Sequence, residues 1–170
     1  YTLKYYVDMA KELQKMGCHS VAIKDMSGLL KPYSAKVLVS GLKDALDIPV
    51  HLHTHDTTGN QVATTLMAAE AGVDIVDLAI ESMSSLTSQP SMNAVVAALE
   101  GQERDTGLSM MDLQKLTDYW ADVRERYVDF ESDLKTPVTD IYRYEIPGGQ
   151  YTNLMYQSQQ LGLSGQWALV

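Results

Sequence analysis

The sequence predicts an α/β fold in which helices cover a parallel sheet. Over the first ninety residues, short apolar segments that suit strands alternate with longer segments that have the 3.6-residue period of helices. The candidate strands cover residues 20–23, 49–56 and 74–79. Lys24 and His53 are 29 residues apart, and His53 and Asp77 are 24 residues apart, as in repeated βα units. An open doubly wound sheet and a barrel both fit these repeats, but 170 residues are too few for a complete eight-unit barrel of about 250.

Composition narrows the class of protein. Hydrophobic residues make up 45% of the chain and charged residues 21%, which is typical of a globular domain and not of a disordered one. The sequence has no apolar run near the ~20 residues that span a bilayer, and no signal-peptide pattern. The single cysteine, Cys18, excludes an internal disulfide and favours a reducing compartment, so we expect a cytoplasmic protein. The formal charge of −9 argues against nucleic acid or an anionic membrane as main partner.

The first unit is predicted by capping residues and helical spacing. Thr2 suits the N-cap of a first helix, and Gly17 suits its left-handed end. The apolar face of this helix consists of Leu3, Tyr6, Val7, Ala10 and Leu13. The chain then enters a short buried strand at 20–23, which ends in Lys24 and Asp25.

The next two units repeat the pattern. Pro32 suits the first turn of a second helix, because the ring presets its backbone there. The inward positions of that helix are Ala35, Leu38, Val39, Leu42 and Leu46. Residues 57–60 form the turn from the second strand into a third helix, which Gly72 ends. The inward positions of the third helix are Val62, Leu66 and Ala69. The third strand at 74–79 follows.

After residue 80 the pattern becomes helical. Residues 81–88 form a polar loop of small residues, and Pro90 begins a short helix. The inward positions of this helix are Val95, Val96 and Leu99. Ser109 is expected to cap a long helix, with Asp112 at the capping-box position.

The long helix carries an apolar seam with coiled-coil spacing. Its members are Leu113, Leu116, Trp120, Val123, Tyr127 and Phe130. Because the seam covers fewer than three heptads, we expect it to pack lengthwise on its own domain. The alternative is that it forms an interface with another copy of the protein. Residues 131–147 look irregular, 147–149 form a turn, and a last helical pattern still runs at 167–170. We therefore divide the chain into an α/β part, 1–85, and a helical part, 86–170.

Three of the four histidines, His51, His53 and His55, lie in the second strand. Positions i, i+2 and i+4 of a strand share one face, so these imidazoles point the same way near the strand's carboxyl end. Two imidazoles in this arrangement can bind one divalent metal, and Asp56 follows directly. The pattern predicts a metal site. The alternative is a buried ladder of hydrogen-bonded histidines.

Lys24 ends the preceding strand, at the edge where parallel α/β proteins bind ligands. A metal would repel an ammonium group, so Lys24 fits a metal site only if it is neutral or modified, or if it acts as a base or Schiff-base lysine. A solvated lysine or an ion pair with Asp25 explains the residue equally well. The glycines Gly28, Gly59 and Gly72 do not form a GxGxxG pattern, which argues against nucleotide binding.

Four motifs, which span nearly the whole chain, resemble the carboxyltransferase domain of biotin-dependent enzymes. They are Ile-Lys-Asp-Met-Ser-Gly-Leu-Leu-Lys-Pro at 23–32, His-Leu-His-Thr-His-Asp-Thr-Thr-Gly at 51–59, Thr-Ser-Gln-Pro-Ser at 87–91 and Glu-Ile-Pro-Gly-Gly-Gln-Tyr-Thr-Asn-Leu at 145–154. The alpha subunit of oxaloacetate decarboxylase and a transcarboxylase subunit share the first two. The last two tilt the resemblance toward the pyruvate carboxylases.

The resemblance implies a TIM barrel followed by a helical, funnel-shaped extension. Residues 1–85 then correspond to the last three βα units of the barrel, and residues 86–170 to the beginning of the extension. The chain would be a partial domain.

The resemblance also implies roles for single residues. Lys24 matches the N-carboxylated (carbamylated) lysine that ligates the metal, which is usually Zn²⁺ or Mn²⁺. His53 and His55 match its two histidine ligands. Carbamylation removes the charge conflict, because it turns the ammonium into an anionic oxygen ligand. Met26 resembles a residue that lines the pyruvate pocket. His51 shares the ligand face but lies deeper, behind the ligands or inside the barrel.

The implied reaction is the transfer of CO₂ from carboxybiotin to pyruvate, which gives oxaloacetate for anaplerosis and gluconeogenesis. A proton moves from pyruvate to biotin, and the resulting enolate attacks CO₂. Biotin would be carried on another domain. The implied partners are pyruvate, carboxybiotin, the rest of the same polypeptide and further copies in a homo-oligomer, with paired carboxyltransferase domains and a tetramer overall.

Several family positions fall outside this sequence. The fourth metal ligand, an aspartate, and the substrate-binding arginine and glutamine would precede Tyr1, and the proton-relay threonine would follow Val170. We therefore expect these 170 residues alone to be inactive. The alternatives are a part of an oxaloacetate decarboxylase or a transcarboxylase, and a non-catalytic structural or dimerisation module.

Overall fold

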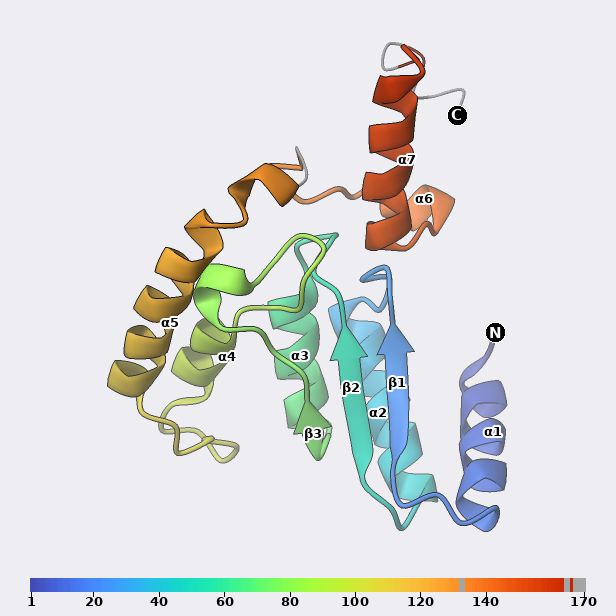
Figure 1. Cartoon of the computed structure of the whole chain (residues 1–170). Coiled ribbons are helices and arrows are strands. Elements are labelled where there is room, and N and C mark those ends of the chain that lie inside the picture. The colour runs from blue at the N-terminus through green and yellow to red at the C-terminus, as the bar shows by residue number, and fades with distance from the viewer. Residues whose placement is uncertain (132–133, 164–165, 167–170) are drawn as a thin grey trace.

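A parallel sheet of three strands, in the order β1-β2-β3, forms the centre of the computed structural model, which describes residues 1–131, 134–163 and 166 (Figure 1). The strands are β1 (Val21–Asp25), β2 (Val50–Thr54) and the short β3 (Ile75–Val76). Lys24 in β1 is the register partner of His53 in β2. The alternation of strands and helices therefore produces the expected parallel α/β arrangement.

Three helices cover one face of the sheet. They are α1 (Leu3–Lys15), α2 (Pro32–Ala45) and α3 (Gln61–Glu70). The buried core between these helices and the strands consists of Ala10, Val39, Leu42, Leu46, Val50, Leu52, Ala68 and Val73. The opposite face of the sheet carries the histidines of β2, and no helix of the described chain covers it (Figure 1).

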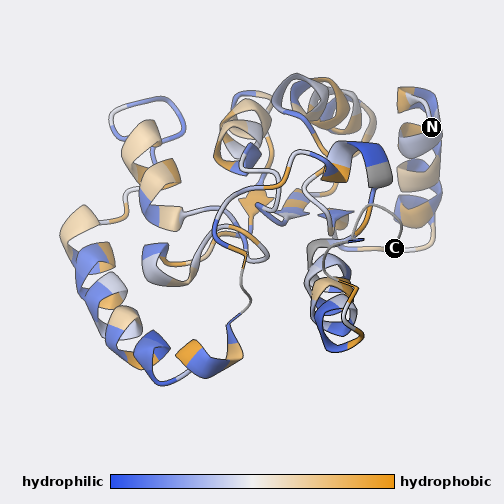
Figure 2. Cartoon of the chain, turned by 90° about the horizontal axis from the view of Figure 1, so that it is seen from above, coloured by the Kyte–Doolittle hydropathy of each residue, from blue (hydrophilic) through white to orange (hydrophobic). Residues whose placement is uncertain are grey.

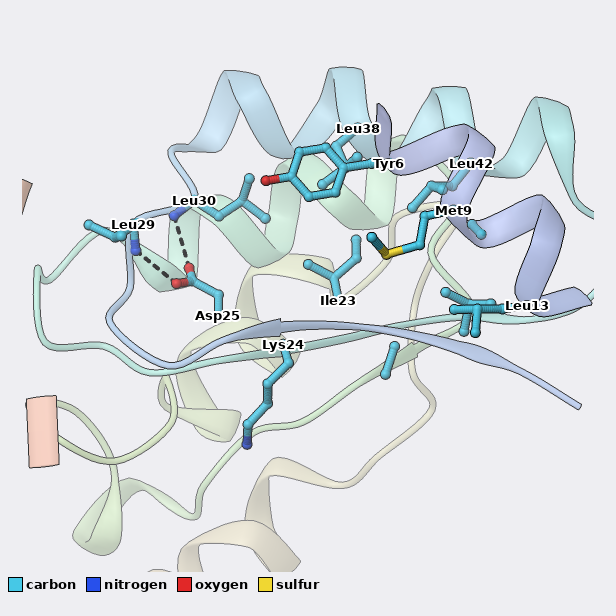
Figure 3. Close-up of a pocket in the computed structure, with 13 residues that line it drawn as sticks. Tyr6, Met9, Leu13, Ile23, Lys24, Asp25, Leu29, Leu30, Leu38 and Leu42 are labelled. Carbon is cyan, nitrogen blue, oxygen red and sulfur yellow. Dashed lines mark hydrogen bonds between the residues drawn. The ribbon is translucent and has the colours of Figure 1, made fainter. Parts of the chain in front are cut away.

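The first helix begins as expected, because the Thr2 hydroxyl accepts a hydrogen bond from the Tyr5 amide. Its apolar face is less buried than expected. Ala10 is fully buried, but Leu3 and Tyr6 keep about two-fifths of their surface exposed (41% and 42%). Tyr6 lies along a groove between α1 and β1 (Figure 3), since β1 has β2 on one edge and, among the described residues, no strand on the other.

The expected burial of the first strand is wrong in part. Alternate residues of β1 are exposed, because helices cover only one face of the sheet. The second helix has Pro32 in its first turn and buries Ala35, Val39 and Leu42, as expected.

The inward face expected for the third helix is also wrong in part. Ala69 is buried, but Val62 and Leu66 are only half-buried. The buried residues include three polar ones, Gln61, Thr64 and Thr65. Gln61 and Thr64 face this way because their side chains donate hydrogen bonds to carbonyl groups of the loop between β1 and α2. Loop carbonyls that lie against the helix require such donors.

The third strand is shorter than the expected 74–79. The amide of Asp77 still donates to the carbonyl of Leu52, but the amide of Ala79 donates to the carbonyl of Pro90. Ala79 thereby forms a parallel bridge with Ser91 and leaves β2. The chain separates from the sheet because this second partner replaces the first.

The segment after the sheet is more helical than expected at one point. The loop expected at 81–88 begins with a 3₁₀ turn, η1 (Glu81–Met83). The short helix α4 (Met92–Leu99) begins two residues after Pro90 and has Ser91 as its N-cap. The long helix α5 (Met110–Glu125) has the expected cap, since Ser109 accepts a hydrogen bond from the Asp112 amide.

Over most of its length the seam does not pack on the described part of the chain. Leu113 is buried with Thr117, but Trp120 is 40% exposed and Phe130 is 85% exposed. The helix ends at Glu125, and Phe130 belongs to the 3₁₀ turn η2 (Val128–Phe130). The helix packs against η1 and α4 and lies at the periphery of the molecule (Figure 2).

The last described segments lie beyond the carboxyl ends of the strands (Figure 1). Within the stretch expected to be irregular, α6 (Ile141–Tyr144) forms one short helix. The turn expected at 147–149 is instead the beginning of α7 (Gly148–Gln160). The pattern at 167–170 lies outside the described residues.

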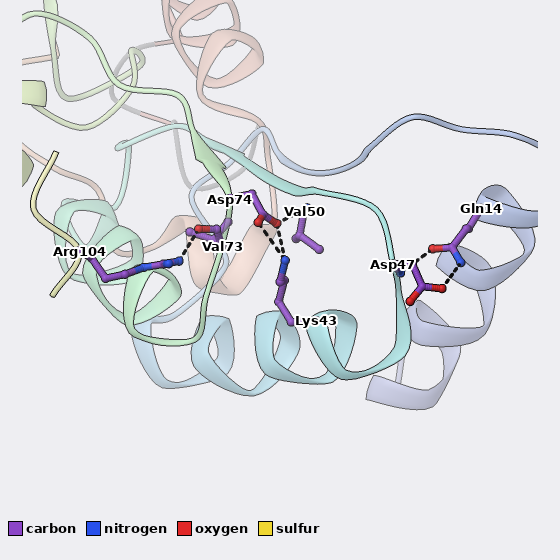
Figure 4. A network of polar contacts seen from close by, with 7 residues as sticks. All are labelled: Gln14, Lys43, Asp47, Val50, Val73, Asp74 and Arg104. Atoms are coloured by element: carbon purple, nitrogen blue, oxygen red, sulfur yellow. Dashed lines mark hydrogen bonds and ion pairs between the residues drawn. The ribbon is translucent and has the colours of Figure 1, made fainter.

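One ion pair and several hydrogen bonds hold the opposite, amino ends of the strands (Figure 4). The Lys43 ammonium lies 2.7 Å from Asp74 Oδ2, and the same oxygen accepts a hydrogen bond from the Val50 amide at 2.8 Å. Burial opposes the charged form of Asp74, but Lys43 and Val50 outweigh it and lower its pKa. Arg104 donates to the carbonyl of Val73.

Among the described residues, no helix has both the length and the apolar character needed to cross a membrane. The division of the chain at residues 85 and 86 remains a prediction.

Candidate metal centre

The strand β2 places its histidines on the open face of the sheet. Val50, Leu52 and Thr54 are buried on the helix side, so His51 and His53 project to the other side. The amide of His55 donates to the carbonyl of Asp25, which extends the pairing of β1 and β2 one step beyond the strand. His55 therefore follows His53 on the same face.

The rings of His53 and His55 converge through one nitrogen each. Their Nε2 atoms lie 3.3 Å apart. His53 Nδ1 lies 2.7 Å from Asp77 Oδ2, and His55 Nδ1 lies 2.7 Å from the carbonyl oxygen of Thr87. A carboxylate and a carbonyl can only accept, so both Nδ1 atoms carry the proton and, in the neutral rings, both Nε2 atoms carry a lone pair.

Two facing lone pairs suit a cation. At this separation both nitrogens could bind the same divalent ion, and imidazole nitrogens are common ligands of Zn²⁺. The amide nitrogen of Gln89 lies 3.5 Å from His55 Nε2 and can only donate, which fits an unprotonated nitrogen. The donors present therefore fit a divalent metal.

Histidines alone do not complete such a site. Within the described part of the chain, no three His, Cys, Asp or Glu residues gather closely enough to hold a metal. A third ligand from the described residues would be of another type, and Lys24 is the candidate that the sequence offers. It lies opposite His53 in the register, and its side chain is exposed.

The alternative ion pair between Lys24 and Asp25 does not form. The two side chains leave β1 on opposite sides (Figure 3). The carboxylate of Asp25 accepts hydrogen bonds from the amides of Leu29 and Leu30, at 3.0 and 2.9 Å, and so closes the loop between β1 and α2. Lys24 is thereby left on the histidine face.

Of the remaining predicted residues, Met26 lies at the site and Asp56 does not. Met26 follows β1 and is half exposed (52%) at the carboxyl end of the sheet. Asp56 is not brought to the histidines as a ligand, because its Oδ1 accepts a hydrogen bond from the Gln61 amide at the beginning of α3. Burial raises the pKa of Asp56, against the lowering effect of its hydrogen bonds with Gln61 and Ser85.

Asp77 is the residue of this candidate site that the sequence reasoning missed. Its Oδ1 lies 2.9 Å from His51 Nε2, without the orientation of a hydrogen bond, while its Oδ2 holds His53. Burial opposes the charge of Asp77, but the contacts with His53 and His51 outweigh it and lower its pKa. The signal was its position in the expected third strand, since a carboxylate next to the histidine strand can orient an imidazole.

Gly28 allows the two loops of the site to touch. Its φ is +69°, and a Cβ atom placed there would lie 2.3 Å from the carbonyl oxygen of His55. Its own carbonyl accepts hydrogen bonds from Thr58 Oγ1 and Gln61 Nε2. The loop after β1 is thus fixed against the segment that follows β2.

Comparison with known proteins identifies the family. A family model described as HMGL-like matches residues 2–120, which is more than half of the chain. The chain belongs to the HMGL-like family. A second model, described as a conserved carboxylase domain, matches residues 141–170 of this HMGL-like chain.

Among curated relatives, a pyruvate carboxylase of Staphylococcus aureus (strain Mu50 / ATCC 700699) is 55% identical over 163 residues, and one of Bacillus subtilis (strain 168) is 52% identical over 167 residues. These matches cover 96% and 98% of the chain but 14% of each relative. The HMGL-like chain therefore spans about a seventh of the length of the curated relatives it matches.

Among solved structures, the carboxyl transferase domain of Rhizobium etli pyruvate carboxylase matches with a TM-score of 0.96 and 51% identity. The match covers 99% of this chain and 28% of that one. The same domain with pyruvate and biocytin matches with the same TM-score. The expected fold, three βα units of a larger carboxyltransferase barrel with the beginning of its extension, is confirmed. The resemblance to pyruvate carboxylases is also confirmed, which leaves the decarboxylase and transcarboxylase alternatives unfavoured.

Proposed function

We propose that this chain forms part of the carboxyltransferase site of a pyruvate carboxylase. In the proposed reaction, carboxybiotin gives up CO₂, the methyl group of pyruvate gives a proton to biotin, and a new bond joins the methyl carbon to CO₂. The products are biotin and oxaloacetate. The convergence of His53 Nε2 and His55 Nε2 at 3.3 Å is the observation that carries the proposal.

His53, His55 and Lys24 would hold the metal, with Zn²⁺ and Mn²⁺ as the expected ions. Lys24 would bind as a carbamate, formed when its ammonium group loses two protons and its Nζ adds CO₂. This change replaces a positive charge by a negative one on the histidine face. A divalent ion held there supplies Lewis-acid polarisation of a substrate carbonyl.

The other residues of the site would orient the two imidazoles and line the substrate pocket. Asp77 and the carbonyl of Thr87 hold the two imidazoles in the tautomer that presents Nε2. Because these partners are fixed before the substrate arrives, little reorganisation is needed during the reaction. Met26 would line the pyruvate pocket, where its half-exposed thioether can contact the substrate's methyl group.

The site would be completed by other parts of the same polypeptide, including a domain that carries biotin. We expect the isolated 170 residues to form no oxaloacetate, and oxaloacetate formation by them alone would contradict this expectation. We further propose a cytoplasmic enzyme that assembles as a homo-oligomer, whose carboxyltransferase domains pair.

Elemental analysis of the full-length enzyme tests the proposal. We expect about one divalent metal per chain in the wild type, and loss of that metal from a variant with both His53→Ala and His55→Ala. His19→Ala is the matched control, because His19 is exposed and lies before β1. Retention of stoichiometric metal by the double variant would overturn the assignment.

A further inference from the structure

We propose that Arg124, in the last turn of α5, is a positioning residue for His55, which it controls through the loop at 84–88. The inference rests on the proposed function, since His55 is the metal ligand whose orientation is at issue. Arg124 itself does not touch the imidazole. Its effect passes through the backbone of η1 and the loop that follows it.

The loop at 84–88 holds the segment that follows β2 by two carbonyl groups. The carbonyl oxygen of Thr87 accepts a hydrogen bond from His55 Nδ1 at 2.7 Å. The carbonyl oxygen of Ser88 accepts one from the Asp56 amide at 2.8 Å. The first of these bonds decides which imidazole nitrogen is free. Loss of the hydrogen bond to Thr87 would remove the contact that favours Nε2 as the ligand atom of His55.

The same loop has a backbone that needs support. Ser85 and Leu86 are consecutive non-glycine residues with left-handed φ values of 71° and 53°. The Ser85 amide donates to the carbonyl of Gln89, and the Ser88 amide donates to the carbonyl of Ser85. Such a conformation persists only when surrounding contacts hold it.

The side of the loop that borders α5 and η2 is not supported by close apolar packing. The loop borders a cavity of about 470 Å³, which is also lined by Arg124, Tyr127 and Phe130. Polar contacts with α5 take the place of packing. Arg124 Nη1 donates to the carbonyl of Ser82 at 2.6 Å, and Arg124 Nε donates to Glu131 Oε1 at 2.5 Å.

A second polar contact fixes the beginning of η1. The amide of Glu81 donates to Asn93 Oδ1, and Asn93 Nδ2 donates to Thr117 Oγ1 on α5. Asn93 is buried, so this contact is part of the folded core. Arg124 lies nearer the loop and is partly exposed, with 42% of its side chain accessible. Its removal should loosen the loop and leave the core intact.

Metal affinity in the full-length enzyme tests the inference. The variants are Arg124→Met, which removes the donors, and Arg126→Met, a control with the same charge change at an exposed neighbouring position. Zn²⁺ affinity is measured by competition with a chromogenic chelator. We expect Arg124→Met to weaken binding by about tenfold or more, as for lost partners of metal-ligating histidines, and Arg126→Met to stay within about twofold.

Two further readouts separate positioning from general stability. The visible spectrum of the Co²⁺-substituted enzyme should change in Arg124→Met and not in Arg126→Met, because it reports the ligand geometry. Arg124→Lys should recover part of the Zn²⁺ affinity, since an ammonium can still donate to Ser82. Wild-type affinity and spectrum in Arg124→Met would overturn the inference while the metal site itself stands.

A milder variant keeps the test decisive if Arg124→Met does not fold. Glu131→Ala removes a surface carboxylate that orients the guanidinium, and we expect it to weaken Zn²⁺ binding by about threefold, as for a surface ion pair. Unchanged affinity in this variant would contradict the inference. A wild-type enzyme that binds no metal through His53 and His55 would instead overturn the proposed function together with it.

Discussion

Gly28→Ala is the substitution whose effect follows most directly from the geometry of the site. Gly28 has φ +69°, so an alanine there pays about 1–2 kcal/mol for the left-handed backbone. Its Cβ would also lie 2.3 Å from the carbonyl oxygen of His55, which is backbone and must move. Forcing this overlap adds about 1–3 kcal/mol. We expect a total loss of about 2–5 kcal/mol in the free energy of unfolding.

Gly101→Ala is the matched control, because Gly101 has φ +70° and nothing within 4 Å of its added Cβ. It should lose only the backbone contribution of about 1–2 kcal/mol. Urea unfolding of the carboxyltransferase domain that contains this chain measures both variants. Gly28→Ala should also weaken Zn²⁺ binding, since the displaced carbonyl belongs to His55. Equal losses of stability in the two variants, with equal metal affinity, would refute the reasoning.

Three other substitutions test contacts that hold the strands and the histidines in place. Asp77→Ala should weaken Zn²⁺ binding by about 10–100-fold, because His53 loses the carboxylate that fixes its tautomer; wild-type affinity in a chelator competition would count against this role. Thr54→Val should lower the free energy of unfolding by about 1–3 kcal/mol, since the buried hydroxyl lies 3.0 Å from both Asp25 Oδ2 and Gln61 Oε1. A urea unfolding curve equal to that of the wild type would contradict this expectation. Asp74→Asn should cost about 1 kcal/mol at pH 7. Because the pKa of Asp74 is lowered on folding from its ordinary 3.8, its contribution is present above that pH and disappears as the pH falls below it; a difference between variant and wild type that stays constant from pH 7 to pH 3 would exclude the ion pair as its source.

Periodicity and capping were enough to place most of the elements. The helix caps at Thr2 and Ser109 and the proline in the first turn of α2 are local features, and the structure has all three. The alternation of His51, His53 and His55 also predicted a shared face, because side-chain direction in a strand depends only on the neighbouring backbone.

Periodicity and capping do not predict contacts between segments that are distant in sequence. The buried polar side of α3 depends on carbonyls of the loop after β1, which Gln61 meets only in the fold. The exposed seam of α5 had the spacing of a packed helix, yet spacing does not show what lies opposite Trp120. The partners of the imidazoles, Asp77 and the Thr87 carbonyl, come from 24 and 32 residues away in sequence.

The most direct test is a crystal structure of the full-length enzyme with anomalous diffraction recorded at the zinc and manganese absorption edges. A metal site built by this chain requires an anomalous peak about 2.0–2.2 Å from Nε2 of both His53 and His55, together with carbamate density on Lys24 Nζ. Two imidazoles with no anomalous peak between them, beside an unmodified Lys24, would contradict the metal centre.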